Sequence, residues 1–214
     1  SAGGEHTCAR KSNGQVRCWG GNYSGEIGDG STTTRLTPVT VSGMSSGIVS
    51  VSAGINNTCA VTSSGALRCW GANSEAQLGD GTTTNRLTPV SVTNMGSGSF
   101  KPDPGYGHSC SLSVNNSARC WGLVNSYGQL GTNDYEPRYT QATVWGMSSG
   151  VSEISIGWGH SCAVTTGGAA RCWGANVWGQ LGTGNNNFSN VPVTVSGLSS
   201  GVSKITSARI GQHS

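Results

Sequence analysis

The stretch Cys59-Ala-Val-Thr-Ser-Ser-Gly-Ala-Leu-Arg-Cys69-Trp70-Gly71 decides the fold, because it contains two short runs on either side of a turn. The turn is centred on Ser64, and the slot after it is filled in the successive copies by Gly14, Gly65, Asn116 and Gly168. Glycine and asparagine tolerate a positive φ, so we expect a left-handed residue here and a β-hairpin around it. In such a hairpin Cys59 and Cys69 lie opposite each other, with Cβ atoms about 4.5–5.5 Å apart, which is near disulfide range.

The same arrangement recurs along the whole chain. The phrase Cys-Trp-Gly occurs four times, and its tryptophans, Trp19, Trp70, Trp121 and Trp173, are 51, 51 and 52 residues apart. The eight cysteines fall into pairs ten residues apart, for which we predict the disulfides Cys8–Cys18, Cys59–Cys69, Cys110–Cys120 and Cys162–Cys172. Zinc sites usually contain cysteines two to four residues apart, so this spacing does not favour a metal.

Two further phrases complete each copy and indicate β-structure. The first is Gly25-Glu-Ile-Gly28, Ala76-Gln-Leu-Gly79, Gly128-Gln-Leu-Gly131 and Gly179-Gln-Leu-Gly182, a tight loop in which we expect the lone aliphatic residue to be the anchor. The second predicts a strand opened by proline, as in Pro38-Val-Thr-Val41, Pro89-Val-Ser-Val92 and Pro192-Val-Thr-Val195; the third copy has Gln141-Ala-Thr-Val144 instead.

A period near 50 residues is in the range of propeller blades. We therefore predict an all-β chain of four repeats with four strands each, every repeat forming one β-propeller blade. The repeats span residues 1–51, 52–102, 103–154 and 155–206, and residues 207–214 begin a fifth copy or form a closing tail.

Composition and cysteine content indicate the compartment and exclude some partners. The formal charge of +3 is small and scattered, so we predict no nucleic-acid binding, and no apolar run approaches the roughly 18 residues of a membrane span. Disulfides persist in oxidising compartments, so we expect an extracellular or cell-surface protein. Ser1 enters directly into repeat sequence, so we expect any targeting segment to lie outside this sequence or to have been removed. Secretion would agree with four asparagine sequons, which are predicted N-glycosylation sites at Asn22, Asn56, Asn115 and Asn187.

The phrases His-Ser/Thr-Cys-Ala, Arg-Cys-Trp-Gly, Gly-Gln-Leu-Gly and Pro-Val-x-Val resemble the regulator of chromosome condensation repeat, in its secreted, cysteine-paired form. The resemblance covers essentially the whole chain and implies a β-propeller, which in this family usually closes with seven blades. Three readings of the four copies stay open: part of a longer array, a small closed ring, or an open arc whose ends pair with other chains. The residues 207–214 favour the array.

Recurring polar residues are expected to be structural. His6, His108 and His160 precede the first cysteine of their copies, with Asn57 in the second copy, and we expect each to hydrogen-bond a neighbouring loop rather than a metal. Arg17, Arg68, Arg119 and Arg171 precede the second cysteine and are expected to cover their own strands or brace a carboxylate. The repeated tryptophans are expected to pack the blades. We predict no metal and no cofactor.

The irregular aromatic residues are the predicted contact residues, because they are not needed to define a blade. They are Tyr23, Tyr106, Tyr127, Tyr135, Tyr139, Trp145, Trp158 and Trp178. Tyrosine and tryptophan often dominate binding when they gather on an exposed surface.

The sequence lacks a nucleophile motif, a P-loop and recurring carboxylate pairs, so we predict that the protein is not an enzyme. The first hypothesis is an extracellular structural or adhesive module that assembles head to tail into a surface fibre, with copies of itself as partners. The alternative is a secreted recognition module for a protein or a glycan, similar to an inhibitor or a lectin. A guanine nucleotide exchange factor, as the founding family member implies, ranks last because nuclear residence conflicts with four disulfides.

Overall fold

The computed structural model describes residues 1–95 and 98–208, apart from the side chains of residues 99 and 100, and shows antiparallel β-structure throughout. The strands in the described part are β1 (His6–Arg10), β2 (Val16–Gly20), β3 (Arg35–Thr40), β4 (Ile48–Ala53), β5 (Asn57–Thr62), β6 (Leu67–Gly71), β7 (Arg86–Ser91), β8 (Ser99–Pro104), β9 (Ser109–Ser113), β10 (Ala118–Gly122), β11 (Arg138–Thr143), β12 (Val151–Ile156), β13 (His160–Thr165), β14 (Ala170–Gly174) and β15 (Ser189–Thr194). Among these residues no helix is long and apolar enough to cross a membrane.

The predicted hairpin is present in every copy and has the expected register. Cys8 pairs with Cys18 across β1 and β2, and the other three cysteine pairs are opposed in the same way. All four predicted disulfides are formed, with Cα atoms 4.0–4.1 Å apart. The turn residues Gly14, Gly65, Asn116 and Gly168 have φ angles of 81°, 80°, 58° and 79°. Turn chemistry and cysteine spacing therefore specify one register, as predicted.

The sheets are offset from the sequence periods by one strand. β4 follows the first Cys-Trp-Gly copy in the sequence, but it pairs with β5 of the second copy. The second, third and fourth blades are thus the four-stranded sheets β4–β7, β8–β11 and β12–β15, while the first blade has three strands, β1–β3. Consecutive copies are linked because each supplies the first strand of the next blade.

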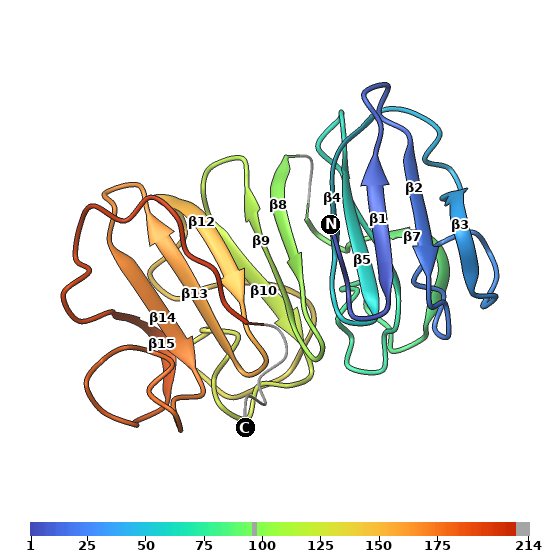
Figure 1. Ribbon diagram of the computed structural model, residues 1–214. Coiled ribbons are helices and arrows are strands. Elements are labelled where there is room, and N and C mark those ends of the chain that lie inside the picture. Colours follow the sequence, from blue (N-terminus) through green and yellow to red (C-terminus); the bar gives the residue numbers. More distant parts are fainter. Residues whose placement is uncertain (96–97, 209–214) are drawn as a thin grey trace.

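The four blades form an open row rather than a closed ring. They follow one another in chain order across Figure 1, from β1–β3 at one end to β12–β15 at the other. Each blade packs against its sequence neighbour, and we call these three contacts the first, second and third joints. The open-array reading of the four copies is confirmed for this structure.

The core lies between the blades. In the first joint the disulfide Cys8–Cys18, Ile27 and Met44 of the first blade pack against Trp70 of the second. The second joint places Leu78 and Val92 against Trp121, and the third places Leu130 and Val144 against Trp173. Three of the four disulfides thus pack against the next blade, whereas Cys162–Cys172 of the fourth blade is buried by Leu181, Val193, Val195 and Ile205.

The disulfides contribute to stability by constraining the unfolded chain. Replacement of both Cys110 and Cys120 by alanine opens a closed loop of about ten residues and is expected to lower the free energy of unfolding by about 3 kcal/mol. Thermal and denaturant unfolding of the variant and the parent chain measure this difference. Non-reducing peptide mapping of the parent is the accompanying check, and bridges between different copies would contradict the register.

Candidate functional site

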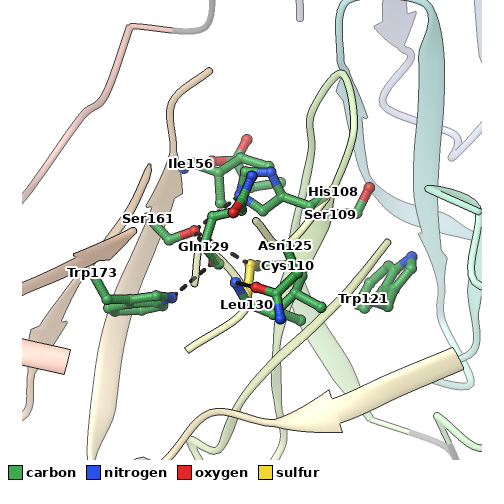
Figure 2. The surroundings of a disulfide bond; sticks show 12 residues. His108, Ser109, Cys110, Trp121, Asn125, Gln129, Leu130, Ile156, Ser161 and Trp173 are labelled. Carbon is green, nitrogen blue, oxygen red and sulfur yellow. Dashed lines mark hydrogen bonds between the residues drawn. A yellow bond between two sulfur atoms is a disulfide. The ribbon is translucent and has the colours of Figure 1, made fainter. Parts of the chain in front are cut away.

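The third joint is organised by one backbone carbonyl, that of Gln129, which accepts two hydrogen bonds from the fourth blade. The Trp173 indole N–H donates to it at 2.9 Å, and the Ser161 hydroxyl donates to it at 2.9 Å (Figure 2). Gln129 and Trp173 belong to the two recurring phrases Gly-Gln-Leu-Gly and Cys-Trp-Gly. The two phrases thus recur together because the Gly-Gln-Leu-Gly loop of one copy supplies the carbonyl that accepts the indole hydrogen bond of the next copy.

The other two joints repeat this geometry. In the first, the Glu26 carbonyl accepts from the Trp70 indole at 2.8 Å and from the Thr58 hydroxyl at 3.0 Å. In the second, the Gln77 carbonyl accepts from the Trp121 indole at 2.9 Å and from the Ser109 hydroxyl at 2.8 Å. The three indoles are fully buried, so each bond is made away from water, where an unpaired donor would be costly.

Two residues of the Gly-Gln-Leu-Gly loop fit it to the tryptophan. The lone aliphatic residue is fully buried in every copy, as predicted for an anchor: Ile27, Leu78, Leu130 and Leu181. The last glycine lies directly against the indole, since a Cβ on Gly131 would be 2.6 Å from Trp173 Nε1. Gly28 and Gly79 have the same relation to Trp70 and Trp121, so a larger residue would push the blades apart.

Two of the recurring histidines join the same network, but their partners are hydroxyls on strands of the next blade rather than the neighbouring loops that were predicted. His6 Nε2 lies 2.7 Å from the Thr58 hydroxyl, and His108 Nε2 lies 3.0 Å from the Ser161 hydroxyl. Because each hydroxyl donates its hydrogen to the carbonyl, its oxygen accepts from the Nε2–H of the histidine. Asn57, which stands at the equivalent position of the second joint, is buried without such a bond.

Burial keeps these histidines neutral. It lowers the pKa of His6 to about 4. It also lowers the pKa of His108 to about 3, with a smaller effect of the same sign from the neighbouring His160. The Nδ1 atoms of His6 and His108 are buried and have no partner among the described residues, so a second proton would create an unpaired buried N–H.

A set of asparagines that sequence reasoning missed holds the loops of the joints. Asn22, Asn73, Asn125 and Asn176 are almost fully buried, and each side-chain oxygen accepts from the backbone N–H of the anchor residue five positions later. Each side-chain amide donates to backbone carbonyls nine and eleven residues away, as in Asn22 to Ser31 and Thr33. The recurrence of asparagine shortly after Trp-Gly was the signal available in the sequence.

The four sequons differ in their access to solvent. Asn115 and Asn187 are exposed and Asn56 is half-buried. The Asn22 side chain is fully buried, and its amide nitrogen is engaged in the hydrogen bonds that hold the loop. Glycosylation stays a prediction, and in the folded chain its exposed acceptors are Asn115 and Asn187.

Several arginines form local contacts, whereas Lys101 pairs with Glu153 at 2.6 Å across the third joint, from β8 to β12. Arg17 donates to the side chain of Gln15, and Arg119 contacts that of Gln141, so these two arginines lie along their own blades. The carboxylates of the loops pair with other arginines, in Arg35–Asp29, Arg86–Asp80 and Arg138–Asp134. Burial acts to raise the pKa of Asp29 and of Asp80, but hydrogen bonds from the Ser31 and Thr82 hydroxyls, together with the Arg35 and Arg86 contacts, hold it below the usual range.

Most of the predicted contact aromatics lie on the surface. Seven of them are between 50% and 87% exposed: Tyr23, Tyr106, Tyr135, Tyr139, Trp145, Trp158 and Trp178. Tyr127 is half-buried, and its ring meets the edge of Phe188 with centroids 5.2 Å apart. Their role in binding stays a prediction.

Comparison with known families agrees with this geometry. Two family models described as "Regulator of chromosome condensation (RCC1) repeat" match the chain, one at residues 1–26, 48–77 and 151–180 and the other at residues 64–112 and 168–214. Together they cover well over half of its length. The chain belongs to the RCC1 repeat family.

Curated and solved relatives share this RCC1 repeat architecture. The Ultraviolet-B receptor UVR8 of Arabidopsis thaliana is 35% identical over 198 residues, which are 91% of this chain and 45% of the receptor. The human E3 ubiquitin-protein ligase HERC2 is 28% identical over 92% of this chain and 4% of the ligase. The chain thus spans less than half the length of these curated relatives.

Two solved structures show the same fold. Human WBSCR16 has a TM-score of 0.81 at 22% identity, covering 97% of this chain and 55% of that one. Yeast RCC1 (Prp20), in its structure bound to Kap60, has a TM-score of 0.79 at 22% identity, covering 97% of this chain and 51% of that one.

The first and the fourth blade of the described chain each have one face that packs against no other blade. Each of these faces corresponds to one side of an internal joint. On the first blade Trp19 is half-buried and Leu36 is 92% exposed, whereas on the second blade Trp70 is fully buried and Leu87 is 36% exposed. On the fourth blade the Gln180 carbonyl has no partner in the described part of the chain. We call these surfaces the tryptophan face, formed by Thr7, Ala9, Trp19 and Leu36, and the carbonyl face, formed by Gly179, Gln180 and Gly182.

The indole bond can be measured with a matched pair of variants. Trp121→Phe removes the donor to the Gln77 carbonyl and leaves a small void, so we expect a loss of about 2 kcal/mol in the free energy of unfolding. Trp19→Phe changes the same motif where no joint exists, and we expect a change within about 0.5 kcal/mol. Denaturant unfolding compares the two, and equal losses would show that the indole acts within its own blade.

The buried histidines predict acid sensitivity. Their pKa values are lowered in the folded chain, so the unfolded chain takes up more protons below its ordinary pKa of about 6.5. The free energy of unfolding should therefore fall as the pH is lowered from about 6.5 towards 4, by up to about 3 kcal/mol per buried histidine. The measurement is urea unfolding at a series of pH values. His108→Asn, which copies Asn57, should flatten the dependence, and an unchanged slope would contradict the assignment.

Proposed function

We propose that this protein is a non-enzymatic structural and adhesive module outside the cell, whose copies join end to end into a fibre through the two outer faces. The proposal is supported by two surfaces of the described chain, a tryptophan face on the first blade and a carbonyl face on the fourth. The three internal joints are the pattern for the proposed contact, since in each of them the carbonyl loop of one blade binds the tryptophan of the next. A contact between unlike faces of identical copies is heterologous, so it propagates into a filament unless its rotation closes a ring.

The extracellular setting is supported by the four disulfides and the lack of free cysteines in the described chain. Such bonds persist where thiols are not kept reduced. They also suit a fibre, because each locks the hairpin that presents both the joint tryptophan and its neighbouring hydroxyl.

Some relatives with this fold bind other proteins. The yeast relative Prp20p was studied for its binding to Gsp1p and histones, and yeast RCC1 (Prp20) was solved bound to Kap60. Those partners belong to proteins about 20% identical to this chain, so we carry over binding of protein and none of the partners. We do not propose nucleotide exchange, since that activity belongs to a compartment in which disulfides are rare.

End-to-end assembly is tested with light scattering and electron microscopy of the 214-residue chain over a range of concentrations. We expect particles whose mass rises in multiples of 21.8 kDa and which appear as rows of blades. Leu36→Asp should abolish growth without affecting folding, because Leu36 is 92% exposed in the single chain.

The matched control is Val114→Asp, which places the same charge on a hairpin turn away from both faces, at a side chain 54% exposed. This variant should assemble like the parent. A parent chain that stays monomeric at every concentration would rule out the fibre.

A second candidate is a secreted recognition module for a protein or a glycan. Its support is the loop of the fourth blade, where Val177, Trp178 and Phe188 are all exposed and the Asn186 side chain ties the loop together by donating to the Val177 carbonyl. A monomeric chain that binds immobilised glycans, and loses that binding with Trp178→Ala, would favour this candidate over the fibre.

A further inference from the structure

The second joint contains one side-chain contact that the sequences of the other two joints do not allow. The Arg119 guanidinium of β10 donates to the side-chain oxygen of Gln141 on β11, and the Gln141 amide donates to the backbone carbonyl of Asn94 at 2.7 Å. Arg119 and Gln141 belong to the third blade, whereas Asn94 belongs to the loop after β7 of the second. One carboxamide group therefore joins two blades, as an acceptor on one side and as a donor on the other.

The first joint has the same arginine but no carboxamide. The strand pairs β6–β7 and β10–β11 have the same register, so Arg68 corresponds to Arg119 and Pro89 corresponds to Gln141. Proline has no side-chain oxygen to offer. The Arg68 side chain is exposed and has no hydrogen-bond or ion-pair partner in the described part of the chain.

The acceptor side of the contact is present in the first joint as well. Gly43 stands in the loop after β3 where Asn94 stands in the loop after β7, and the two residues have left-handed φ angles of 70° and 59°. No described residue donates a hydrogen bond to the Gly43 carbonyl. The first joint thus contains the donor and the acceptor that Gln141 links in the second joint.

Arg68 and Gly43 both line one cleft between the first and second blades. Its volume is about 590 Å³, which is in the range of small-ligand sites. Arg68 is the only charged residue among the described residues that line it. A guanidinium group without a carboxylate beside it is available to an oxygen acceptor from outside the chain.

The rest of the lining matches a sugar. Hydroxyl groups both donate and accept hydrogen bonds, so they suit the hydroxyl groups of a sugar ring. The cleft contains four such side chains, those of Ser42, Ser46, Thr62 and Thr88. The Pro89 ring also lines the cleft, and it stands where the second joint has the aliphatic stem of Gln141. It provides an apolar surface on which a methyl group can pack.

We infer that the cleft of the first joint binds an N-acetylated amino sugar. The acetamido oxygen accepts from Arg68, the acetamido N–H donates to the Gly43 carbonyl, and the methyl group packs on Pro89. A carboxylate would satisfy Arg68 but has no hydrogen for the carbonyl, whereas the Gln141 carboxamide has both groups. The cleft lies within one chain, so this binding goes beyond end-to-end assembly and does not depend on it.

The ligand class is tested by titrating the ¹⁵N-labelled 214-residue chain with N-acetylglucosamine, glucose and glucuronate, and following backbone amide shifts by NMR. We expect N-acetylglucosamine to bind about tenfold more tightly than either of the others, because a hydrogen bond to a charged donor and a second bond are both gained. The largest shifts should be at Gly43 and Arg68. Equal affinity for glucose, or tighter binding of glucuronate, would overturn the assignment of the acetamido group.

The site is tested by a variant that copies the second joint. Pro89→Gln supplies the chain's own carboxamide to Arg68 and to the Gly43 carbonyl, so it should lower the affinity for N-acetylglucosamine by about tenfold or more while the chain stays folded. Pro38→Gln is the matched control, since it makes the same change on β3 at a residue that does not line the cleft. It should bind like the parent. A Pro89→Gln chain that binds as tightly as the parent would overturn the inference.

Two further measurements separate this site from other sources of binding. Glutamine side chains of a protein carry the same carboxamide, so tighter binding of a glutamine-containing peptide than of N-acetylglucosamine would overturn the sugar as the ligand. Trp178→Ala alters the exposed loop of the fourth blade and should leave the affinity for N-acetylglucosamine unchanged. A loss with this variant would place the sugar on that loop and contradict the cleft.

Discussion

The arrangement of the blades depends on one backbone carbonyl in each joint, which accepts an indole N–H and a hydroxyl from the next blade. The indole is fully buried, so its hydrogen bond and the close packing around it must form together, since either alone would leave a buried polar group or a void. The requirement runs in both directions. The loop needs glycine because the indole lies against it, and the neighbouring copy needs tryptophan because the carbonyl would otherwise lose its main donor. Motifs that look independent in the sequence are therefore the two halves of one contact.

This constraint gives every blade two unlike faces and makes the array one-dimensional. In the first three blades the disulfide and the aliphatic anchor are covered by the tryptophan of the next blade, so each of these three hydrophobic clusters belongs to a pair of blades. The stability of such an array is approximately the sum of the blades and their nearest-neighbour contacts. The first strand of a blade also connects it to the preceding blade. β4, β8 and β12 each follow one Cys-Trp-Gly copy in the sequence and pair with the hairpin of the next copy.

The sequence alone was sufficient for the hairpins, because their determinants are local. A left-handed residue and two cysteines ten positions apart specify the register within a dozen residues, and Gly14, Gly65, Asn116 and Gly168 adopt the predicted positive φ. The joints could not be derived in this way, since their bonds connect residues 32, 44 and 52 positions apart. The tryptophans were expected to pack the blades, but nothing local indicated that their partners lie in the preceding blade. Asn22 was interpreted as a sequon because Asn-x-Ser is a local pattern, whereas its role in holding the loop requires carbonyls nine and eleven residues away.

The chemistry of the joints also explains how the blades can be joined in a chain in which few residues are charged. The bonds that recur in all three joints are made by indole and hydroxyl groups to main-chain carbonyls, and the arginine–aspartate pairs lie within single loops. One ion pair, Lys101–Glu153, crosses the third joint from β8 to β12. Glu26 is a further exception, as it stands where the other copies have glutamine, and burial raises the pKa of its carboxyl group. The carbonyl face of the fourth blade carries the neutral residue, Gln180. A contact between that face and the tryptophan face would therefore rest on apolar burial and neutral hydrogen bonds, which salt screens little. In the proposed assembly outside the cell, such a joint would hold its neighbours through changes of ionic strength better than one built on ion pairs.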